Sequence, residues 1–502
     1  MNIVWFKRDL RIEDHAALLS AAKDGAVLPL YILEPELWRQ PDMSYRHYRF
    51  LQDCLAELNQ ELSHIGQKLI IKVGSATVIL NDLNNKYNIT SLWSHQETWN
   101  GWTYSRDKAV KKWCRQHNVI WHEPVSNGVI RCLESRNGWA SRWYSQMKKS
   151  CLCKPQSLQT IAEPTEVLPT YEELGLSHDG ITSMQKGGRS EGLKLLDSFL
   201  YLRGENYTKE MSSPVTAFES CSRLSTHLAF GTLSMREVFQ AYERRSGEIK
   251  KMPRGEKGKW PSAMRSFSGR LRWRCHFTQK LEDEPRIEFE NMHPAYNSIR
   301  VKEFNDEYFE AWKKGMTGYP MVDACMRALT ATGWLNFRMR AMVMSFASYH
   351  LWLHWRKPAL HLANMFTDYE PGIHYSQVQM QSGTTGINAI RIYNPLKQST
   401  DNDEKGVFIR HWVKELANID DSYIHTPWEA PEQMNGYPMP IIEEKIARKY
   451  AADKLYGMRR NSFAHKESAK KIIEKHASRR PALARSTRKR VAKDNSQGEL
   501  PL

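Results

Sequence analysis

Within residues 317–395, five charged side chains lie in or next to helical faces whose pattern indicates burial. They are Asp323, Arg327, Arg338, Arg340 and Asp368. Apolar residues recur around them at i, i+3, i+4 and i+7, which predicts buried helical faces. Ionised groups tolerate burial only with partners. The set therefore predicts either internal ion pairs or a bound charged ligand.

A helical pattern at His227–Gly231 is preceded by a short segment rich in polar residues, Ser222-Arg223-Leu224-Ser225. Hydroxyls and free N–H groups at the start of a helix can bind phosphate. Serine is also a common N-cap, so a purely structural role is the alternative.

The segment 266–285 combines basic and aromatic residues. Its members are Arg270, Arg272, Arg274 and Lys280, alternating with Trp273 and Phe277. Basic side chains pair with phosphates and aromatic rings stack on bases, so the pattern is typical of a nucleic-acid surface. The alternative is a solvated basic helix with a buried aromatic face.

The elements that position these residues follow from the order of the patterns. Apolar runs at 2–6, 26–33 and 68–73 predict buried strands, with helical patterns between them. Alternating strands and helices predict a doubly wound parallel sheet, which we place at 1–130. The expected connector, 131–190, is rich in Pro and Gly, and an all-helical domain is expected at 191–440. No glycine-rich fingerprint follows the first strand, which disfavours an ordinary dinucleotide site.

Composition limits the class of protein. The chain has 502 residues, 41% of them apolar, and a net charge of +16, which favours a polyanionic partner such as nucleic acid. No long apolar span or signal peptide is evident, so we expect a soluble cytoplasmic protein, without membrane contact and monomeric. The eight cysteines are interpreted as reduced thiols. Cys151 and Cys153 lack a second Cys or His pair, so no metal site is expected.

The segment 317–395 resembles the flavin-binding core of the photolyase/cryptochrome family, through 317–327, 332–334, 355–356 and 391–395. The opening VWFKRDLRIEDHAAL is similar to the start of the same family's antenna domain. The resemblance implies that FAD is bound by Tyr207, Ser222, Arg223, Leu224, Ser225, Arg274, Arg340, Asp368, Tyr369 and Glu370. It also implies that Trp273 stacks on a DNA lesion, in a DNA surface formed by Arg270, Arg272, Trp273, Phe277 and Lys280.

The chain departs from the family pattern at several positions. Arg270 replaces a glutamate that helps to protonate the lesion, and Phe337 replaces an asparagine that touches it. In the family's electron-transfer chain, Trp355 matches the middle tryptophan and Tyr296 the surface one. The flavin-proximal tryptophan is missing, and Tyr375 is the nearest substitute.

Other cofactors of the family are less well supported by the sequence. The antenna segment 95–107 lacks the expected glutamate before its Arg-Asp pair, so an antenna chromophore is uncertain or absent. No cysteine follows Cys325, which argues against an iron–sulfur cluster whose ligands lie near the C-terminus.

The last segment, 441–502, is expected to be a basic extension that is helical at first and disordered later, with non-specific affinity for DNA. Its final residues, Gln497 to Leu502, are similar to peptides that bind bacterial sliding clamps.

Together these features predict a photolyase that uses reduced FAD and light to split pyrimidine dimers in UV-damaged DNA. A cyclobutane dimer is favoured over a (6-4) product, because the histidine pair typical of (6-4) enzymes is missing at Phe337 and Ala341. The protein would work at the bacterial nucleoid. The alternatives are a cryptochrome-like blue-light receptor that binds FAD without repair, and a basic nucleic-acid binder without a chromophore.

Overall fold

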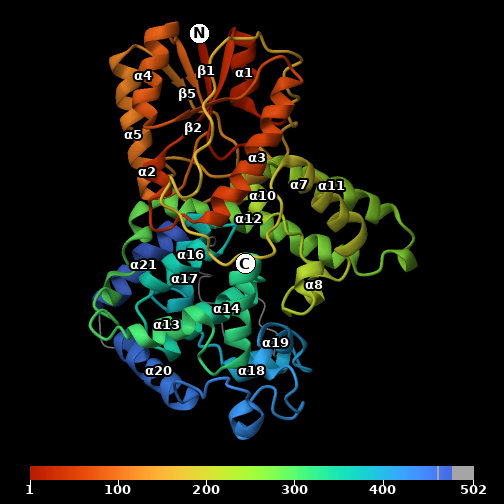
Figure 1. Ribbon diagram of the computed structural model, residues 1–502, viewed down its shortest axis with the longest axis vertical. Coiled ribbons are helices and arrows are strands. Elements are labelled where there is room, and N and C mark those ends of the chain that lie inside the picture. The colour runs from red at the N-terminus through yellow and green to blue at the C-terminus, as the bar shows by residue number, and fades with distance from the viewer. Residues whose placement is uncertain (461–462, 478–502) are drawn as a thin grey trace.

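The computed structural model describes residues 1–460 and 463–477. An α/β domain occupies one end of the molecule and a larger helical domain the other, as Figure 1 shows. The structure confirms the fold class predicted from the sequence. In the part of the chain that is described, no helix is both long enough and apolar enough to cross a bilayer.

The α/β domain is built on a parallel sheet of five strands in the order β3-β2-β1-β4-β5. The strands are β1 (Asn2–Phe6), β2 (Val27–Leu33), β3 (Ile70–Val73), β4 (Ser91–Trp93) and β5 (Ile120–His122). The register aligns Ile3 of β1 with Leu28 of β2 and with Leu92 of β4. Because the order reverses at β1, the loop after β1 lies at the switch point of the sheet, where open α/β sheets bind ligands.

Both faces of the sheet are covered by helices. Ile3 and Trp5 pack toward α4 (Ala76–Tyr87) and α5 (Gly101–Gln116), in a cluster that includes Leu80 and Val110. Val4 and Phe6 face the other way, toward α1 (Ala16–Asp24) and α3 (Tyr45–Ser63). This alternation follows from the two-residue period of a strand. The second apolar cluster continues into the helical domain, so the two domains share one core.

The expected connector runs along the edge of the sheet. Glu166 N donates to the carbonyl of Ile71 in β3, and Ile71 N donates to Thr165 Oγ1, both at 2.9 Å. The connector also contains α6 (Trp139–Met147), whose Trp143 is fully buried. It therefore covers an edge strand rather than spanning open solvent.

The helical domain is arranged around α12 (Trp260–Asp283), which packs along α17 (Pro371–Ser382) and α11 (Met235–Lys251). Further helices complete its core: α7 (Arg189–Ser198), α10 (Ser225–Phe230), α13 (Asp306–Lys314), α14 (Pro320–Thr332), α15 (Phe337–Ser345) and α16 (Arg356–Met365). This arrangement brings residues near 223, 270, 340 and 370 into one region.

Two C-terminal helices lie beyond the expected domain boundary at 440. In α20 (Glu444–Arg460), Ala451 and Leu455 are fully buried against the helical domain. In α21 (Phe463–His476), Ile472 packs on Leu281 and Ile287, and His476 bonds Glu284 at 2.6 Å. The first part of the predicted extension is therefore packed onto the helical domain. The clamp-like hexapeptide 497–502 lies outside the described residues.

Candidate functional site

An ion pair between α15 and the residue three positions before α17 anchors the site. Arg340 donates from Nη1 and Nη2 to the two carboxylate oxygens of Asp368, each at 2.9 Å. Burial raises the pKa of Asp368, but the charge and hydrogen bonds of Arg340, with Ser225 and Arg223 nearby, outweigh it and leave the pKa below its ordinary value. Asp368 is therefore a fixed buried anion.

A second ion pair joins α12 to the start of α17. Arg274 Nη2 lies 2.5 Å from Glu370 Oε2 and also donates to the carbonyl of Leu228 at 2.9 Å. Tyr369, between the two carboxylates in sequence, points elsewhere: its hydroxyl donates to Asp42 of the α/β domain at 2.8 Å. The structure thus brings Asp368 and Glu370 to the helical side of the site, and Tyr369 to the domain interface.

Arg223 has a buried guanidinium without a matching carboxylate. Its backbone has a φ of +60°, and the guanidinium carbon lies 3.9 Å from the Phe218 ring centre and 4.2 Å from that of Trp334. Nε and Nη1 have no hydrogen-bond partner among the described residues, although the residue is only 8% exposed. Burial lowers the pKa of Arg223 to about 10, so the group still carries its charge at neutral pH.

Arg270, Trp273 and Phe337 form an aromatic and cationic group beside this site. The Arg270 guanidinium lies 4.3 Å from the Trp273 ring centre and 5.6 Å from that of Phe337. Its Nη2 contacts Met211 Sδ at 3.7 Å, and its buried Nη1 has no partner among the described residues. Phe337 is 40% exposed, so the group opens to solvent. Tyr207, near Arg270, is buried, and burial raises its pKa to about 12.

The residues expected to carry electrons also lie close to one another. The Trp355 and Tyr375 rings are 6.3 Å apart and nearly perpendicular. Trp355 Nε1 donates to Asn291 Oδ1 at 2.7 Å, and Asn291 Nδ2 donates to the carbonyl of Tyr296 at 2.9 Å. The expectation that Tyr296 lies at the surface is wrong: its side chain is fully buried, because α20 and α21 cover it.

The family follows from comparison with known proteins. Residues 267–456 match the model of the FAD binding domain of DNA photolyase, and residues 2–167 match the model of DNA photolyase. The chain belongs to the photolyase/cryptochrome family. Its helical domain is therefore the FAD-binding domain of that family.

Relatives of this photolyase/cryptochrome chain carry both names. It is 27% identical to the deoxyribodipyrimidine photo-lyase of Vibrio cholerae, over 89% of this chain and 97% of that one. It is 29% identical to cryptochrome-2 of Arabidopsis thaliana, over 90% and 78%. Among solved structures it resembles a bacterial class III photolyase from Agrobacterium tumefaciens, with a TM-score of 0.78 and 26% identity over 92% and 98% of the two chains.

The buried donors of the site fit the FAD of this family. FAD carries a pyrophosphate, and a doubly charged group matches the unpartnered Nε and Nη1 of Arg223 and the unpartnered Nη1 of Arg270. Ser222 and Ser225 flank Arg223 and Leu224 in sequence, with Leu224 buried behind them. The fit rests on charged groups that the described protein leaves uncompensated.

The side chains expected to contact DNA do not share one face of α12. Arg270 and Trp273 lie beside the candidate FAD site, whereas Arg272 bonds the Tyr144 hydroxyl at 3.0 Å. Lys280 is only 6% exposed, and burial together with Arg136 lowers its pKa to about 8. Phe277, 5.3 Å from the Lys280 ammonium, is half-buried. Arg272 thus lies on another side of α12 from Arg270 and Trp273, and Lys280 is buried.

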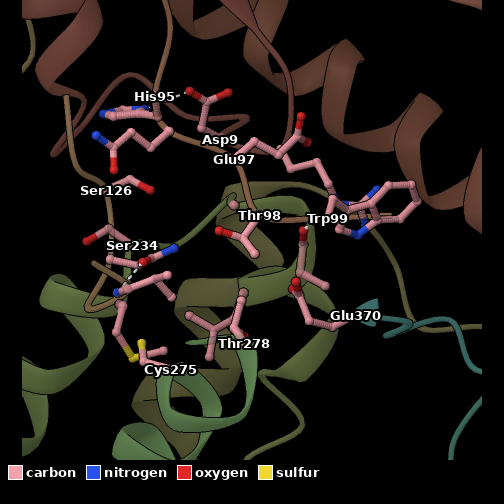
Figure 2. Close-up of a pocket in the computed structure, with 18 of the residues that line it drawn as sticks. Asp9, His95, Glu97, Thr98, Trp99, Ser126, Ser234, Cys275, Thr278 and Glu370 are labelled. Atoms are coloured by element: carbon pink, nitrogen blue, oxygen red, sulfur yellow. Dashed lines mark hydrogen bonds and ion pairs between the residues drawn. The ribbon is translucent and has the colours of Figure 1, made fainter. Parts of the chain in front are cut away.

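A cavity of about 80 Å³ between the domains was not expected from the sequence. Figure 2 shows Asp9 and His95 of the α/β domain on one side of it, and Glu370 with Thr278 of the helical domain on the other. The cavity lies beside the loop that follows β1, at the switch point of the sheet. The Arg274–Glu370 pair forms part of its wall on the side of the helical domain.

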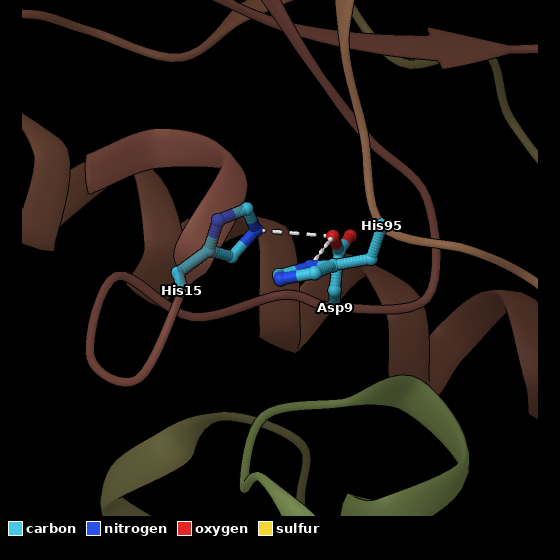
Figure 3. A group of neighbouring side chains, drawn as sticks. All are labelled: Asp9, His15 and His95. Atoms are coloured by element: carbon cyan, nitrogen blue, oxygen red, sulfur yellow. Dashed lines mark hydrogen bonds and ion pairs between the residues drawn. The ribbon is translucent and has the colours of Figure 1, made fainter. Parts of the chain in front are cut away.

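The same region contains a buried group of three side chains, Asp9, His15 and His95, shown in Figure 3. Asp9 Oδ2 lies 2.7 Å from His95 Nδ1 and 3.0 Å from His15 Nε2. The contact between His15 Nε2 and Asp9 does not have the geometry of a hydrogen bond. His15 Nδ1 accepts from Leu18 N, so the neutral ring carries its proton on Nε2 and cannot bind a metal there. His95 is far from Asp9 and His15 in sequence, which explains why sequence patterns missed this group.

The predicted antenna segment is held by ion pairs within the protein. Arg106 pairs with Glu34 at 3.0 Å, Glu97 at 2.6 Å and Asp107 at 2.8 Å. Its guanidinium also lies 4.7 Å from the Trp5 ring centre. Glu34, Glu97 and Arg106 also line a cavity of about 30 Å³ in the α/β domain.

Proposed function

We propose that this protein repairs UV-induced pyrimidine dimers in DNA, using light and an electron from reduced FAD. The observation that carries the proposal is the solvent-facing group of Trp273, Phe337 and Arg270 beside the buried charges of the flavin site. Aromatic rings and a cation at the mouth of a cofactor pocket suit two linked adjacent pyrimidines turned out of the duplex, as enzymes acting on bases require.

The roles of the chain's own residues follow from their charge. In this proposal Arg223, with Ser222, Leu224, Ser225 and Tyr207, holds the FAD phosphates. The Arg340–Asp368 and Arg274–Glu370 pairs fix charges beside the flavin ring, with Tyr369 behind them. Reduced FAD supplies the electron when it absorbs light, and the protein supplies position and electrostatics.

The lesion site favours a cyclobutane dimer over a (6-4) product. The positions that carry a histidine pair in (6-4) enzymes are Phe337 and Ala341, neither of which can transfer a proton. Trp273 and Phe337 offer stacking surfaces, and the Arg270 guanidinium beside them adds a positive charge that suits the DNA backbone. We further propose that the protein acts as a monomer in the bacterial cytoplasm, at the nucleoid where its substrate lies.

The test is repair under blue light by the reduced, FAD-loaded protein. One oligonucleotide carries a cyclobutane dimer, a second carries a (6-4) product, and a dark sample serves as the control. Light-dependent loss of the cyclobutane dimer supports the proposal. Repair of the (6-4) product alone would overturn the choice of lesion. No repair by a protein that is yellow when oxidised, and that was fully reduced for the assay, would overturn the activity.

A second candidate, a blue-light receptor that binds FAD without repairing DNA, is favoured by one observation. Arg270 stacks on Trp273 and places a cation where the family's repair enzymes have an acid, and cryptochromes are among the relatives. A receptor predicts light-dependent changes in flavin absorbance without loss of either lesion. A colourless protein would exclude both candidates and leave a plain nucleic-acid binder.

A further inference from the structure

Four basic side chains from three parts of the chain meet at the C-terminal end of α12. His276 and Lys280 lie one turn apart on α12, Arg136 belongs to the segment before α6, and His476 belongs to α21. Arg136 Nη1 lies 3.4 Å from His276 Nδ1. Burial lowers the pKa of both histidines, and so do the nearby charges of Lys280 and Arg136. The four side chains therefore form one group.

Lys280 is a nearly buried ammonium without an anionic partner. Only 6% of the residue is exposed, and its Nζ makes no hydrogen bond or ion pair with any described residue. Nζ lies 5.3 Å from the ring centre of Phe277. Burial lowers the pKa of Lys280 to about 8, helped by the charge of Arg136, so the amine is still mostly charged at pH 7. A buried charge ordinarily has a partner, and Lys280 lacks one in the described protein.

The two carboxylates at the edge of this group are already used by other side chains. Asp283 Oδ1 accepts from Gln279 Nε2 at 2.8 Å, and its Oδ2 lies 3.2 Å from Arg136 Nε. Glu284 bonds His476 at 2.6 Å and pairs with Lys475 at 3.3 Å. Neither carboxylate forms an ion pair with Lys280.

Arg136 and His476 also keep polar atoms without partners. Arg136 is 7% exposed and His476 is fully buried. Arg136 Nη2 and His476 Nδ1 have no hydrogen-bond partner in the part of the chain that the structure describes. The group thus holds an excess of positive charge together with unused hydrogen-bonding atoms, which suits an anion.

We propose that Lys280 and Arg136 bind a small phosphate anion here, between α12 and α21. Phosphate fits because it offers several oxygens and more than one negative charge, which lysine meets as a point charge and arginine through its N–H groups. The low exposure of Lys280 favours a small anion over the backbone of a DNA duplex. The site lies outside the flavin site, and this inference goes beyond the proposed repair function.

A phosphate in this position would also hold α21 onto the helical domain. His476 brings α21 to the group, whereas Lys280 belongs to α12 and Arg136 to the segment before α6. A ligand that binds only the docked arrangement stabilises that arrangement. Phosphate should therefore slow the local opening of α21.

The test is isothermal titration calorimetry of the full-length, FAD-loaded protein with inorganic phosphate at pH 7, in the dark and at constant ionic strength. We expect saturable binding of one phosphate per chain. Lys280→Met removes the charge but keeps a long side chain, and it should weaken binding by at least about tenfold, because a charge-assisted hydrogen bond is lost. Arg136→Gln should weaken it as well. The matched control is Lys470→Met, which replaces an exposed lysine of α21 and should leave the affinity unchanged.

Hydrogen exchange gives a second measurement. Phosphate should slow exchange in α21 of the unmodified protein and of Lys470→Met, but not in Lys280→Met. If Lys280→Met does not fold, Arg136→Gln takes its place in both experiments.

Three results would overturn the inference. The first is the absence of saturable binding, and the second is equal weakening in Lys470→Met, which would indicate general attraction to a basic protein. The third is displacement of the phosphate by an intact DNA duplex, which would assign the site to the DNA backbone instead of a small anion. Each readout is independent of light, so failure of the repair function would leave this inference standing.

Discussion

The Arg340–Asp368 pair shows how the site combines stability with binding. Both oxygens of Asp368 are used by one guanidinium, and the carboxylate side chain is only 5% exposed. Removing either partner leaves a buried charge, whereas removing a surface pair costs little. Mutations that break a buried pair and an exposed pair should therefore differ in how much they lower the free energy of unfolding.

Replacement of Arg340 by Leu is expected to lower the free energy of unfolding by about 3 kcal/mol, because it leaves Asp368 buried without its partner. FAD content should fall in the same variant, since an uncompensated anion would lie beside the flavin. Urea unfolding gives the first quantity, and the ratio of absorbance at 450 and 280 nm reports the second. The control is Arg49→Gln, which breaks an exposed pair with Asp53; a loss as large as that of Arg340→Leu would contradict the argument.

Arg270 and Arg272 allow a second prediction about single residues. Arg270 lies with Trp273 and Phe337, while Arg272 bonds Tyr144 away from that group. Arg270→Gln should therefore reduce the preference for damaged over intact DNA, whereas Arg272→Gln should leave this preference unchanged. Fluorescence anisotropy with both duplexes, over a series of salt concentrations, measures it. Equal loss of preference in the two variants would contradict a site limited to one side of α12.

At the scale of elements, Asp323 determines how α14 begins. Its carboxylate accepts from Thr317 N at 2.9 Å, from Thr317 Oγ1 at 2.7 Å and from Gly318 N at 3.0 Å, and also from the Tyr437 hydroxyl. The sequence indicated a buried charge that needed a partner. The partners are hydrogen-bond donors of the preceding turn and of a distant segment rather than a cation.

Asp323→Ala should therefore destabilise the protein by about 3–5 kcal/mol, because several buried donors lose their acceptor together. Denaturant unfolding measures the loss, and hydrogen exchange should show opening at the start of α14. Asp306→Ala in the first turn of α13 is the matched control, since its side chain is 75% exposed. A change below about 1 kcal/mol in Asp323→Ala, typical of surface substitutions, would count against this role.

The elements differ in how far the sequence predicted them. The first three strands are long apolar runs between helical patterns, so the α/β class was predictable. Strands β4 and β5 have three residues each and carry no usable period. The burial of Tyr296 depends on Arg459 and His465, more than 160 positions away, in a segment whose basic composition suggested an extension. Local patterns do not contain such long-range contacts.

At the scale of the whole molecule, buried neutral histidines link stability to pH. Burial lowers the pKa of His47, His227 and His374 to about 4 each. Hydrogen bonds to backbone carbonyls raise these pKa values but do not offset burial: His47 Nε2 lies 2.9 Å from the Phe366 oxygen, and His374 Nε2 lies 2.8 Å from that of Ala359. These side chains lie at the domain interface and in the helical core.

The sign of the effect follows from proton binding. An unfolded histidine titrates near pH 6.5, so between about pH 6.5 and 4 the unfolded chain binds more protons than the native one. The contribution of these histidines to stability should therefore be constant above about pH 7 and fall as the pH drops through this window. Each histidine contributes a slope of up to ~1.4 kcal/mol per pH unit. Denaturant unfolding at a series of pH values measures the total slope.

One variant isolates a single histidine in this profile. His227 is fully buried and its Nε2 has no partner among the described residues, so His227→Leu removes a titrating group at modest cost in hydrogen bonds. Between pH 6.5 and 4, the slope of the free energy of unfolding against pH should be smaller in this variant, by the contribution of about one bound proton. The control is His411→Gln, which replaces an exposed histidine and should leave the profile unchanged. If His227→Leu kept the full slope, His227 would not contribute to it, and the slope would have to arise from the other buried histidines, such as His47 and His374.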